Sequence, residues 1–375
     1  MIVGVPKETK VHEYRVGLTP QSVRELVAHG HEVRVETGAG AAIDFSDDDY
    51  RAAGAKVAAT AQSVFAGADL IVKVKEPLEP ERRQLRENQV LFTYLHLAPD
   101  PLQAKELLAS RAVCIAYETV TSEAGTLPLL APMSEVAGRM SIQAGATALE
   151  KSHGGRGVLL AGVPGVAPAK VAIIGGGVVG INAAQMAVGL GADVTVLDRS
   201  VEVLRRIDAR FDGAVKTVYS TRAAIESAAL EADLVIGAVL VPGAAAPKLI
   251  DRAFLKRMKR GAVLVDVAID QGGCFETSRP TTHDKPTYEV DGIIHYCVAN
   301  MPGAVARTST LALNNATLPF VLALADKGWK RALREDAHFG SGLNVAAGKL
   351  TNRAVAEALG LPFTPADAAL LAEAA

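Results

Sequence analysis

The stretch Gly175-Gly-Gly-Val-Val-Gly180 decides the fold of this chain. It ends an apolar run at 170–175 that predicts a β-strand, and it opens a helical pattern at 178–190. A second predicted strand, at 193–197, leads to Asp198, 23 residues after Gly175. In this context the first glycine permits a tight turn, the second lets the backbone approach a pyrophosphate, and the third lets helix and strand pack closely. The spacing predicts a dinucleotide-binding βαβ unit.

Asp198 indicates which dinucleotide binds. A carboxylate at the end of the second strand accepts hydrogen bonds from the ribose hydroxyls of NAD and repels the 2′-phosphate of NADP. Arg199 follows it and would soften that repulsion. The N-terminus of the helix supplies N–H groups and the positive end of a dipole for the phosphates. We therefore expect NAD as the cofactor; the alternatives are a glycine turn without a ligand and an Asp198 that only caps a turn.

Length and composition restrict the class of protein. The 375 residues suggest two domains, or three. The net charge is −2 and there is no Lys/Arg run, so we expect no nucleic-acid partner and no anionic membrane surface. A hydrophobic content of 49% suits a packed α/β enzyme, whereas 5% aromatic residues disfavour a base-stacking platform. The three cysteines lie far apart and form no CxxC, which predicts reduced thiols rather than a disulfide framework or a zinc ribbon.

One segment has the hydropathy of a membrane span. Residues 171–192 carry no charge, but they include six glycines together with Asn182 and Gln185. A strand, turn and helix in a sheet account for that pattern better than a span does. The N-terminus has no basic region followed by an apolar stretch, so it does not resemble a signal peptide. We therefore expect a cytoplasmic protein without a membrane partner.

Strand and helix patterns alternate on both sides of the glycine stretch. Before it, strands are predicted at 2–5, 31–36, 70–74, 90–95 and 113–117. After it, further strands are predicted at 234–239, 262–267 and 292–298. Strands separated by helical stretches indicate mostly parallel sheets.

The domain organisation follows from the connections. A proline-free helical stretch at 133–151 and a Gly/Pro-rich linker at 154–168 separate the two series, and a helical tail follows residue 303, with its longest stretch at 308–327. That tail is too short to form a domain, so we expect it to pack on the first one. The prediction is an α/β fold of two doubly wound, mostly parallel-sheet domains. A Rossmann-type NAD-binding domain, residues 131–305, is inserted in a discontinuous substrate and catalytic domain, residues 1–130 and 306–375.

Polar residues gather at the ends of predicted strands, where α/β enzymes place their sites. Arg15 precedes a helix that begins with Thr19-Pro20, and Lys75, His96 and Asp270 follow predicted strands. Each alone has an ordinary explanation. Arg15 would be a solvated surface cation, His96 a half-buried histidine and Asp270 a turn residue. Lys75 would be a strand-end charge on the same face as Lys73, with either lysine able to face solvent.

Taken together, these four residues suggest chemistry. A pair of cations can hold a substrate carboxylate, and a histidine can exchange a proton near neutral pH. With NAD, the set suits oxidation at a carbon beside a carboxylate, and it leaves open whether the substrate is an amino acid or a hydroxy acid. The other seven histidines are interpreted as structural, with His295 alone positioned in a strand where it would line a cleft.

Longer blocks resemble the L-alanine dehydrogenases. The resemblance runs from residue 1 to about residue 360. Its most specific blocks lie at 3–9, 15–20, 94–99, 134–138, 162–165, 266–273 and 295–304. It implies the reversible conversion of L-alanine, water and NAD to pyruvate, ammonia and NADH by a homohexamer, with no metal site. By similarity, Arg15 and Lys75 bind the substrate carboxylate or carbonyl oxygen, Tyr94 and Asn300 contact the substrate, His96 is the general acid/base and Asp270 is the second acid/base group.

The resemblance also implies the cofactor contacts. By similarity and from the glycine motif they are Ser134, Gly175, Gly177, Val178, Val179, Gly180, Asp198, Ser220, Val239, Leu240, Val267, Ala268, Ile269, Asp270, Arg279, Val298, Ala299, Asn300 and Met301.

Three other functions remain open at this point. The soluble NAD-binding component of a proton-translocating transhydrogenase shares the layout, but an Arg, Gln and Asp trio is expected there where this chain has Met-Ser-Glu-Val-Ala-Gly at 133–138. A dehydrogenase for a related amino acid is the second. A non-catalytic NAD-binding regulatory protein is the third, and it would have no use for all four of Arg15, Lys75, His96 and Asp270.

Overall fold

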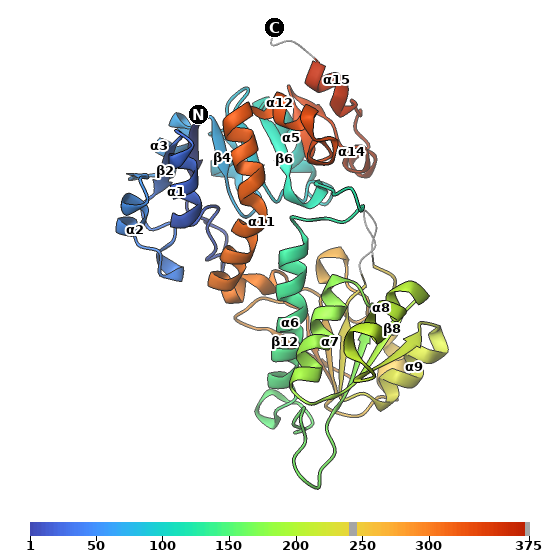
Figure 1. Cartoon of the computed structure of the whole chain (residues 1–375). Helices are drawn as coiled ribbons and strands as arrows, with labels where there is room; N and C mark the ends of the chain where they lie inside the picture. Colours follow the sequence, from blue (N-terminus) through green and yellow to red (C-terminus); the bar gives the residue numbers. More distant parts are fainter. Residues whose placement is uncertain (240–245, 372–375) are drawn as a thin grey trace. The chain divides into compact units, whose positions relative to one another are not determined.

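The computed structural model describes residues 1–239 and 246–371, and they form two compact units (Figure 1). Unit 1 comprises Met1–Pro132 and Val305–Ala375, and unit 2 comprises Met133–Ala304. The chain passes from unit 1 to unit 2 at the start of helix α6 (Ala131–Ala148) and returns through the 3₁₀ segment η5 (Met301–Val305). Each unit contains one sheet, so the predicted class of two mostly parallel-sheet domains is confirmed.

Unit 1 contains an eight-stranded sheet in the order β15-β14-β6-β5-β4-β1-β2-β3. Its strands are β1 (Ile2–Val5), β2 (Glu32–Glu36), β3 (Lys56–Ala58), β4 (Leu70–Val72), β5 (Val90–Thr93), β6 (Val113–Ala116), β14 (Leu343–Ala346) and β15 (Lys349–Leu350). Strands β1 to β6 are parallel, and β14 runs antiparallel to β6 and to β15. The chain places β2 and β3 on one side of β1 and β4 to β6 on the other, so the winding reverses between β1 and β4.

The C-terminal tail is part of unit 1. The helices of this unit are α1 (Pro20–Ala28), α2 (Asp47–Ala52), α3 (Ala61–Gly67), α4 (Glu79–Arg82), α5 (Pro101–Ser110), α11 (Ala306–Lys327), α12 (Trp329–Glu335), α13 (Ala337–Gly340), α14 (Arg353–Leu359) and α15 (Ala366–Leu371). Thr19 caps α1 with its side chain. Asn314 of α11 accepts hydrogen bonds from the Thr19 N–H (2.8 Å) and the Ser22 hydroxyl (2.9 Å), which ties the tail to the first helix.

Helix α11 lies within the one helical stretch, Met301–Lys327, that is long and apolar enough to cross a membrane, among the residues that the structure describes. Its buried side chains include Thr310, Asn314 and Thr317, which hydrogen-bond within unit 1. Buried polar side chains need hydrogen-bond partners, and in α11 the protein itself supplies them, as is typical of a helix in a protein core.

Unit 2 contains a seven-stranded sheet in the order β12-β13-β11-β10-β7-β8-β9. Its strands are β7 (Lys170–Ile174), β8 (Asp193–Asp198), β9 (Val215–Tyr219), β10 (Leu234–Gly237), β11 (Val263–Asp266), β12 (Thr287–Val290) and β13 (Ile293–Tyr296). All pairs are parallel except β12 with β13, and the winding reverses between β7 and β10. In addition to α6, its helices are α7 (Val178–Gly189), α8 (Val201–Phe211), α9 (Arg222–Glu231) and α10 (Arg252–Leu255).

The uncharged segment 171–192 is therefore a strand, a turn and a helix, as predicted. In unit 1 an apolar cluster of buried residues gathers around Phe65, Leu91 and Leu107, and in unit 2 another gathers around Val235 and Phe254. The three cysteines are free and buried.

Candidate cofactor and substrate sites

The glycine turn of unit 2 contains glycines of two kinds. Gly175 has φ +104°, and a Cβ there would lie 2.6 Å from the Ala238 carbonyl oxygen. A Cβ on Gly180 would lie 1.8 Å from the Gly175 carbonyl oxygen. The fold itself excludes side chains at both positions. Among the described residues other than its two chain neighbours, in contrast, no atom lies within 4 Å of a Cβ built on Gly177, so this glycine leaves open space there at the start of α7. Open space beside the N–H groups of a helix N-terminus fits a pyrophosphate.

Asp198 is the last residue of β8, and the backbone fixes its carboxylate. Oδ2 accepts the Gly176 N–H (2.7 Å) and Oδ1 accepts the Ser200 N–H (2.8 Å). The carboxylate is thus joined directly to the glycine turn. Each carboxylate oxygen can accept a further hydrogen bond, so the position suits the ribose hydroxyls of NAD.

The other predicted cofactor residues gather at the same edge of the sheet. Ser220 directly follows β9, Val239 lies two residues after β10, Val267 directly follows β11 and Val298 lies two residues after β13. Because the carboxyl ends of parallel strands meet at one edge, the topology brings these loops together at the place where open α/β sheets bind ligands. The same loops contain Ala268, Ile269, Asp270, Ala299, Asn300 and Met301. Leu240 lies outside the described residues.

Helix α6 positions Ser134 beside this edge. Gly138, one turn later on the same helix, approaches α7 so closely that a Cβ would lie 2.3 Å from the Val179 carbonyl oxygen. Arg139 also donates to the Asn182 side chain of α7 (3.0 Å). The structure thus packs the turn of α6 that follows Ser134 against the first turn of α7, which contains Val178 and Val179.

A buried carboxylate that sequence reasoning missed organises the loop that carries Asp270. Asp266 is fully buried and accepts the N–H groups of Ala268 (3.1 Å), Cys274 (2.8 Å) and Phe275 (3.3 Å). Asp270 itself is exposed, in a 3₁₀ turn within that loop. No sequence motif marks Asp266, because only folding brings its partners to it: these backbone N–H groups, the Cys274 thiol and the Ser278 hydroxyl.

Arg279 and Asn300 have neighbours that the sequence did not predict. The Arg279 guanidinium lies 4.3 Å from the centre of the Tyr288 ring, and the Arg279 N–H donates to the Tyr288 hydroxyl (2.8 Å). Asn300 has φ +66°, and its carbonyl contacts His283 Nε2 (3.1 Å).

The expectation that His295 lines a cleft is wrong. This histidine is fully buried in β13, hydrogen-bonded to the Thr277 hydroxyl (2.7 Å) and the Ile293 carbonyl (3.1 Å). Burial lowers the pKa of His295.

In unit 1 the candidate substrate residues also follow neighbouring strands. Arg15 lies in the connection after β1, Lys75 in the one after β4 and His96 in the one after β5. These strands lie side by side in the order β5-β4-β1, next to the reversal of winding. The topology therefore gathers the three residues at one edge, as it does the cofactor residues in unit 2.

Arg15 is buried and paired with Glu13. Its Nε and Nη2 donate to the two oxygens of that carboxylate, at 2.7 and 2.5 Å. Burial opposes the charged guanidinium, but the hydrogen bonds to Glu13 and its charge outweigh burial and raise the pKa of Arg15. Glu13 fixes the plane of the guanidinium, and sequence reasoning missed it.

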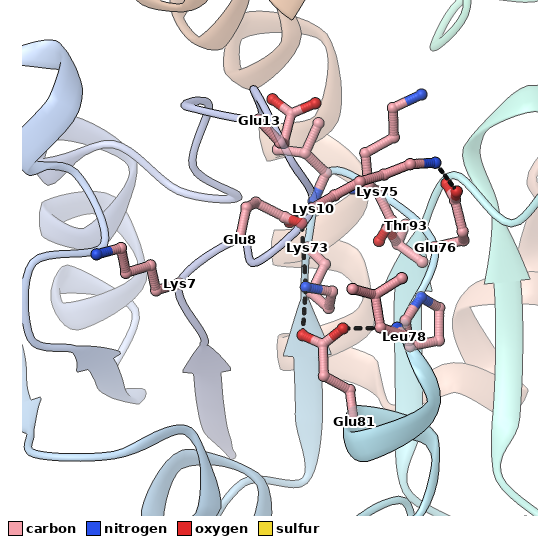
Figure 2. Close-up of polar contacts among 12 residues, drawn as sticks. Lys7, Glu8, Lys10, Glu13, Lys73, Lys75, Glu76, Leu78, Glu81 and Thr93 are labelled. Atoms are coloured by element: carbon pink, nitrogen blue, oxygen red, sulfur yellow. Dashed lines mark hydrogen bonds and ion pairs between the residues drawn. The ribbon is translucent and has the colours of Figure 1, made fainter. Parts of the chain in front are cut away.

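Lys73 and Lys75 differ, which corrects the expectation that either would face solvent. Lys73 is fully buried and donates to Glu8 (3.1 Å) and Glu81 (2.7 Å), whereas Lys75 is half-buried. The alternation fails because β4 ends at Val72. Figure 2 shows the Lys75 side chain pointing away from Lys73 and Glu81.

His96 is exposed and has a left-handed backbone, with φ +48°. Its N–H donates to Glu118 (2.7 Å), which also accepts the Leu95 N–H (3.2 Å). A non-glycine residue at positive φ is strained and needs such anchoring. Its ring stacks on Tyr94 with ring centres 5.8 Å apart. Tyr94 is buried, its hydroxyl proton is donated to the Leu129 carbonyl (2.6 Å), and burial raises its pKa.

Over residues 1–239 and 246–371, no group of three or more His, Cys, Asp or Glu side chains is arranged to hold a metal ion.

Comparison with known proteins gives the family. The models of the alanine dehydrogenase/PNT N-terminal and C-terminal domains match residues 4–137 and 141–353. The alanine dehydrogenase of Halomonas elongata is 64% identical over 366 residues, which cover 98% of this chain and 99% of that protein. The alanine dehydrogenase of Mycolicibacterium smegmatis is 58% identical over the same shares of the two chains.

Solved structures agree with the sequence comparison. An L-alanine dehydrogenase structure superimposes with a TM-score of 0.93 at 52% identity, covering 96% of this chain and 99% of that one. A transhydrogenase from Sinorhizobium meliloti, at 24% identity and a TM-score of 0.81 over 94% of this chain and 100% of its own, shares the fold. Since both family models match and the relatives agree over nearly their whole length, this chain belongs to the alanine dehydrogenase family.

Proposed function

We propose that this NAD-dependent oxidoreductase acts on L-alanine: L-alanine, water and NAD⁺ are converted reversibly to pyruvate, ammonium, NADH and a proton. The main observation in support is that Arg15, Lys75 and His96 follow three neighbouring strands of unit 1. Two cations and a histidine at one sheet edge fit a small carboxylate whose neighbouring carbon exchanges a proton. Similarity to the alanine dehydrogenases supports alanine over a hydroxy acid.

The proposal assigns substrate binding to residues 1–130 and 306–375 and NAD binding to residues 131–305. Arg15 binds the substrate carboxylate. A guanidinium has five N–H donors in a planar fork, and Glu13 accepts from two of its nitrogens, so the fork is already oriented before the substrate arrives. Lys75 donates to the substrate carboxylate or to the carbonyl oxygen of pyruvate. Tyr94 and Asn300 complete the proposed substrate contacts.

His96 is the proposed general acid/base. In deamination its neutral imidazole accepts a proton as water adds to the imine carbon, and it returns a proton as the carbinolamine releases ammonia. Asp270 orients the water or ammonia and acts as the second acid/base group. When bound, NAD accepts the hydride that leaves the alanine Cα.

The residues of unit 2 fit NAD. Gly177 and the first N–H groups of α7 would hold the pyrophosphate, and Asp198 would accept the ribose hydroxyls. The loops after β9, β10, β11 and β13, with Ser134 and Arg279, would supply the remaining contacts. The fixed Asp198 charge would disfavour a 2′-phosphate, so NAD is favoured over NADP.

The proposed assembly is a cytoplasmic homohexamer. Family resemblance supports the hexamer, and free buried cysteines agree with a reducing compartment. Light scattering on the purified protein should give about six times the 39.1 kDa chain mass. A monomer or dimer at working concentrations would contradict the hexamer without affecting the proposed reaction.

The first test of the reaction is NADH absorbance at alkaline pH with NAD and a panel of small L-amino acids and hydroxy acids. Turnover with L-alanine well above all others is expected. Preference for another amino acid would replace the substrate and keep the reaction class. Measurable NAD binding without turnover on any substrate would contradict the proposal and favour a hydride exchange with a partner protein or a binding-only role.

A further inference from the structure

The buried lysine of unit 1 has no part in the reaction described above. The Lys73 ammonium lies between Glu8 and Glu81, and all three side chains are almost completely buried. Burial opposes the charge, but the two carboxylates outweigh it and raise the pKa of Lys73, so the ammonium stays protonated. A buried ion cluster of this kind contributes little net stability, and replacing one with apolar side chains is often neutral or stabilising. We therefore ask which parts of the backbone the Lys73 cluster holds in place.

Each carboxylate uses its second oxygen on the backbone around Lys75. Glu8 binds Lys73 through Oε2, while its Oε1 accepts the N–H groups of Val74 (2.7 Å) and Lys75 (3.4 Å). Glu81 binds Lys73 through Oε1, while its Oε2 accepts the Leu78 N–H (2.7 Å). One ammonium therefore joins two carboxylates that hold the chain before and after Lys75 (Figure 2).

This segment depends on such anchors because it has no regular structure. Residues 73–78 lie outside any helix or strand. On the other side of Lys75, the Thr93 hydroxyl donates to the Lys75 carbonyl (2.9 Å). Glu8 belongs to the connection after β1 that also contains Arg15. The cluster thus links the loops of the two proposed substrate cations.

We propose that Lys73 is a positioning residue for Lys75: by joining Glu8 to Glu81 it fixes the backbone on both sides of Lys75 and so sets where the Lys75 ammonium meets the substrate. This inference rests on the proposed role of Lys75. Lys73 is too deeply buried to touch the substrate, so it acts only through its two carboxylates. The prediction is a loss of substrate binding without a loss of NADH binding, because the NADH residues lie in unit 2.

The primary test is Glu81→Gln. Glutamine has nearly the same shape and one carbonyl oxygen, so it can accept the Leu78 N–H or the Lys73 ammonium but cannot bridge both. The variant removes one buried negative charge and should fold. We expect KM for pyruvate to rise about tenfold, the scale of a small displacement of a binding group, with the NADH Kd from fluorescence titration unchanged.

The matched control is Glu79→Gln on the same short helix. Glu79 is exposed and pairs with exposed Arg83, so its loss should leave KM for pyruvate unchanged. Lys73→Met is the stronger variant and should raise KM further; its control is Lys56→Met, which removes an exposed lysine of β3 that pairs with Glu32 of β2. If Lys73→Met does not fold, Glu81→Gln still decides the question.

Three measurements separate the outcomes. A raised KM for pyruvate with unchanged NADH Kd and melting temperature supports the positioning role. An unchanged KM in folded Glu81→Gln overturns it, and so does a parallel loss of substrate binding, NADH binding and melting temperature, which would indicate a merely structural cluster. Lys75→Ala tests the underlying assignment: if pyruvate KM and kcat are unchanged there, the role of Lys75 fails, and the positioning role fails with it.

Discussion

The two sheets of this protein are wound in the same way but are followed by different loops. In unit 1 the chain fills β1, β2 and β3, then returns to β4, β5 and β6 on the other side of β1. In unit 2 it fills β7, β8 and β9, then returns to β10, β11 and β13. Each winding brings the loops at the carboxyl ends of the strands to one edge, beside one reversal.

The connection after the first strand is where the units differ. In unit 2 it is the three-residue glycine turn at 175–177, which leads directly into α7 and exposes peptide N–H groups. In unit 1 it is the charged segment 6–19, which carries Glu8, Glu13 and Arg15 before α1 begins. Peptide groups at a helix N-terminus suit a phosphate, whereas a guanidinium fork suits a carboxylate. The two units therefore share the placement of their strand-end loops and differ in the chemical groups that the first loop presents.

The largest expected effect is in unit 1. His96→Ala should lower kcat by about 10²-fold or more, the scale of a lost acid/base group. The NADH Kd should not change, because unit 2 is intact. His153→Ala, at an exposed histidine of unit 2, is the control. Near-normal turnover in His96→Ala would contradict the assignment of acid/base chemistry to this residue of unit 1.

The pH dependence sharpens the same point. A general base must be unprotonated to accept a proton in deamination, so the rate of alanine oxidation should fall as the pH is lowered. A profile of kcat/KM for L-alanine from pH 6 to 9 measures this. A flat profile would argue against His96 as the base.

Asp270 tests the contribution of unit 2 to the chemistry. Asp270→Ala should also lower kcat by about 10²-fold. Because Asp266 organises this loop through backbone groups, the loop should keep its conformation without the Asp270 side chain. The NADH Kd should therefore change little. A large rise in NADH Kd with normal kcat would reassign Asp270 from acid/base chemistry to cofactor binding alone.

The glycine turn gives a prediction of intermediate size. Gly180→Ala forces a Cβ to within 1.8 Å of the Gly175 carbonyl oxygen, so it should lower both the melting temperature and NADH affinity. Gly177→Ala meets no atom within 4 Å in the described part of the chain beyond its two neighbours, so it should keep the melting temperature and lower only NADH affinity. Thermal unfolding and fluorescence titration distinguish the two. Equal melting temperatures in both variants would contradict the division of the turn into fold-required and ligand-required glycines.

The same contrast explains what the sequence could predict. Local patterns identified the glycine turn, the strands on either side of it and the parallel sheets, because the βαβ unit is encoded within a short stretch of chain. They did not predict β9 or β14. Strand β9 is half-exposed and mixed in polarity, and β14 joins the sheet by pairing with β6 from the far end of the chain. Pairing over that distance has no local signature.

The candidate site divides in the same manner. The residues named at strand ends, Arg15, Lys75 and His96, could be found because topology sends strand ends to one edge. Their supports Glu118 and Glu8 could not, since these carboxylates bind backbone N–H groups that only folding brings near. Glu13 lies two residues from Arg15, but no motif in the sequence marks their pairing. The burial of Lys73 depends on Glu8, 65 residues away in sequence, and is invisible for the same reason. The catalytic roles of the named residues stay predictions until the variants are measured.

The smallest expected effect concerns cofactor choice. Asp198→Ala removes a charge that the backbone holds at the end of β8, and with it the repulsion of a 2′-phosphate. The ratio of kcat/KM for NAD to that for NADP should fall by about tenfold, which corresponds to about 1.4 kcal/mol, because the 2′-phosphate is no longer repelled. The Gly176 and Ser200 N–H groups would then lose their acceptor and be free to bind the added phosphate, as Arg199 would.

Asp198→Asn keeps an acceptor for these N–H groups and removes only the charge, so it separates the effect of charge repulsion from the effect of loop order. If Asp198→Asn changes the ratio as much as Asp198→Ala, charge alone sets the preference. An unchanged ratio in both variants would contradict the role of Asp198 in selecting NAD over NADP.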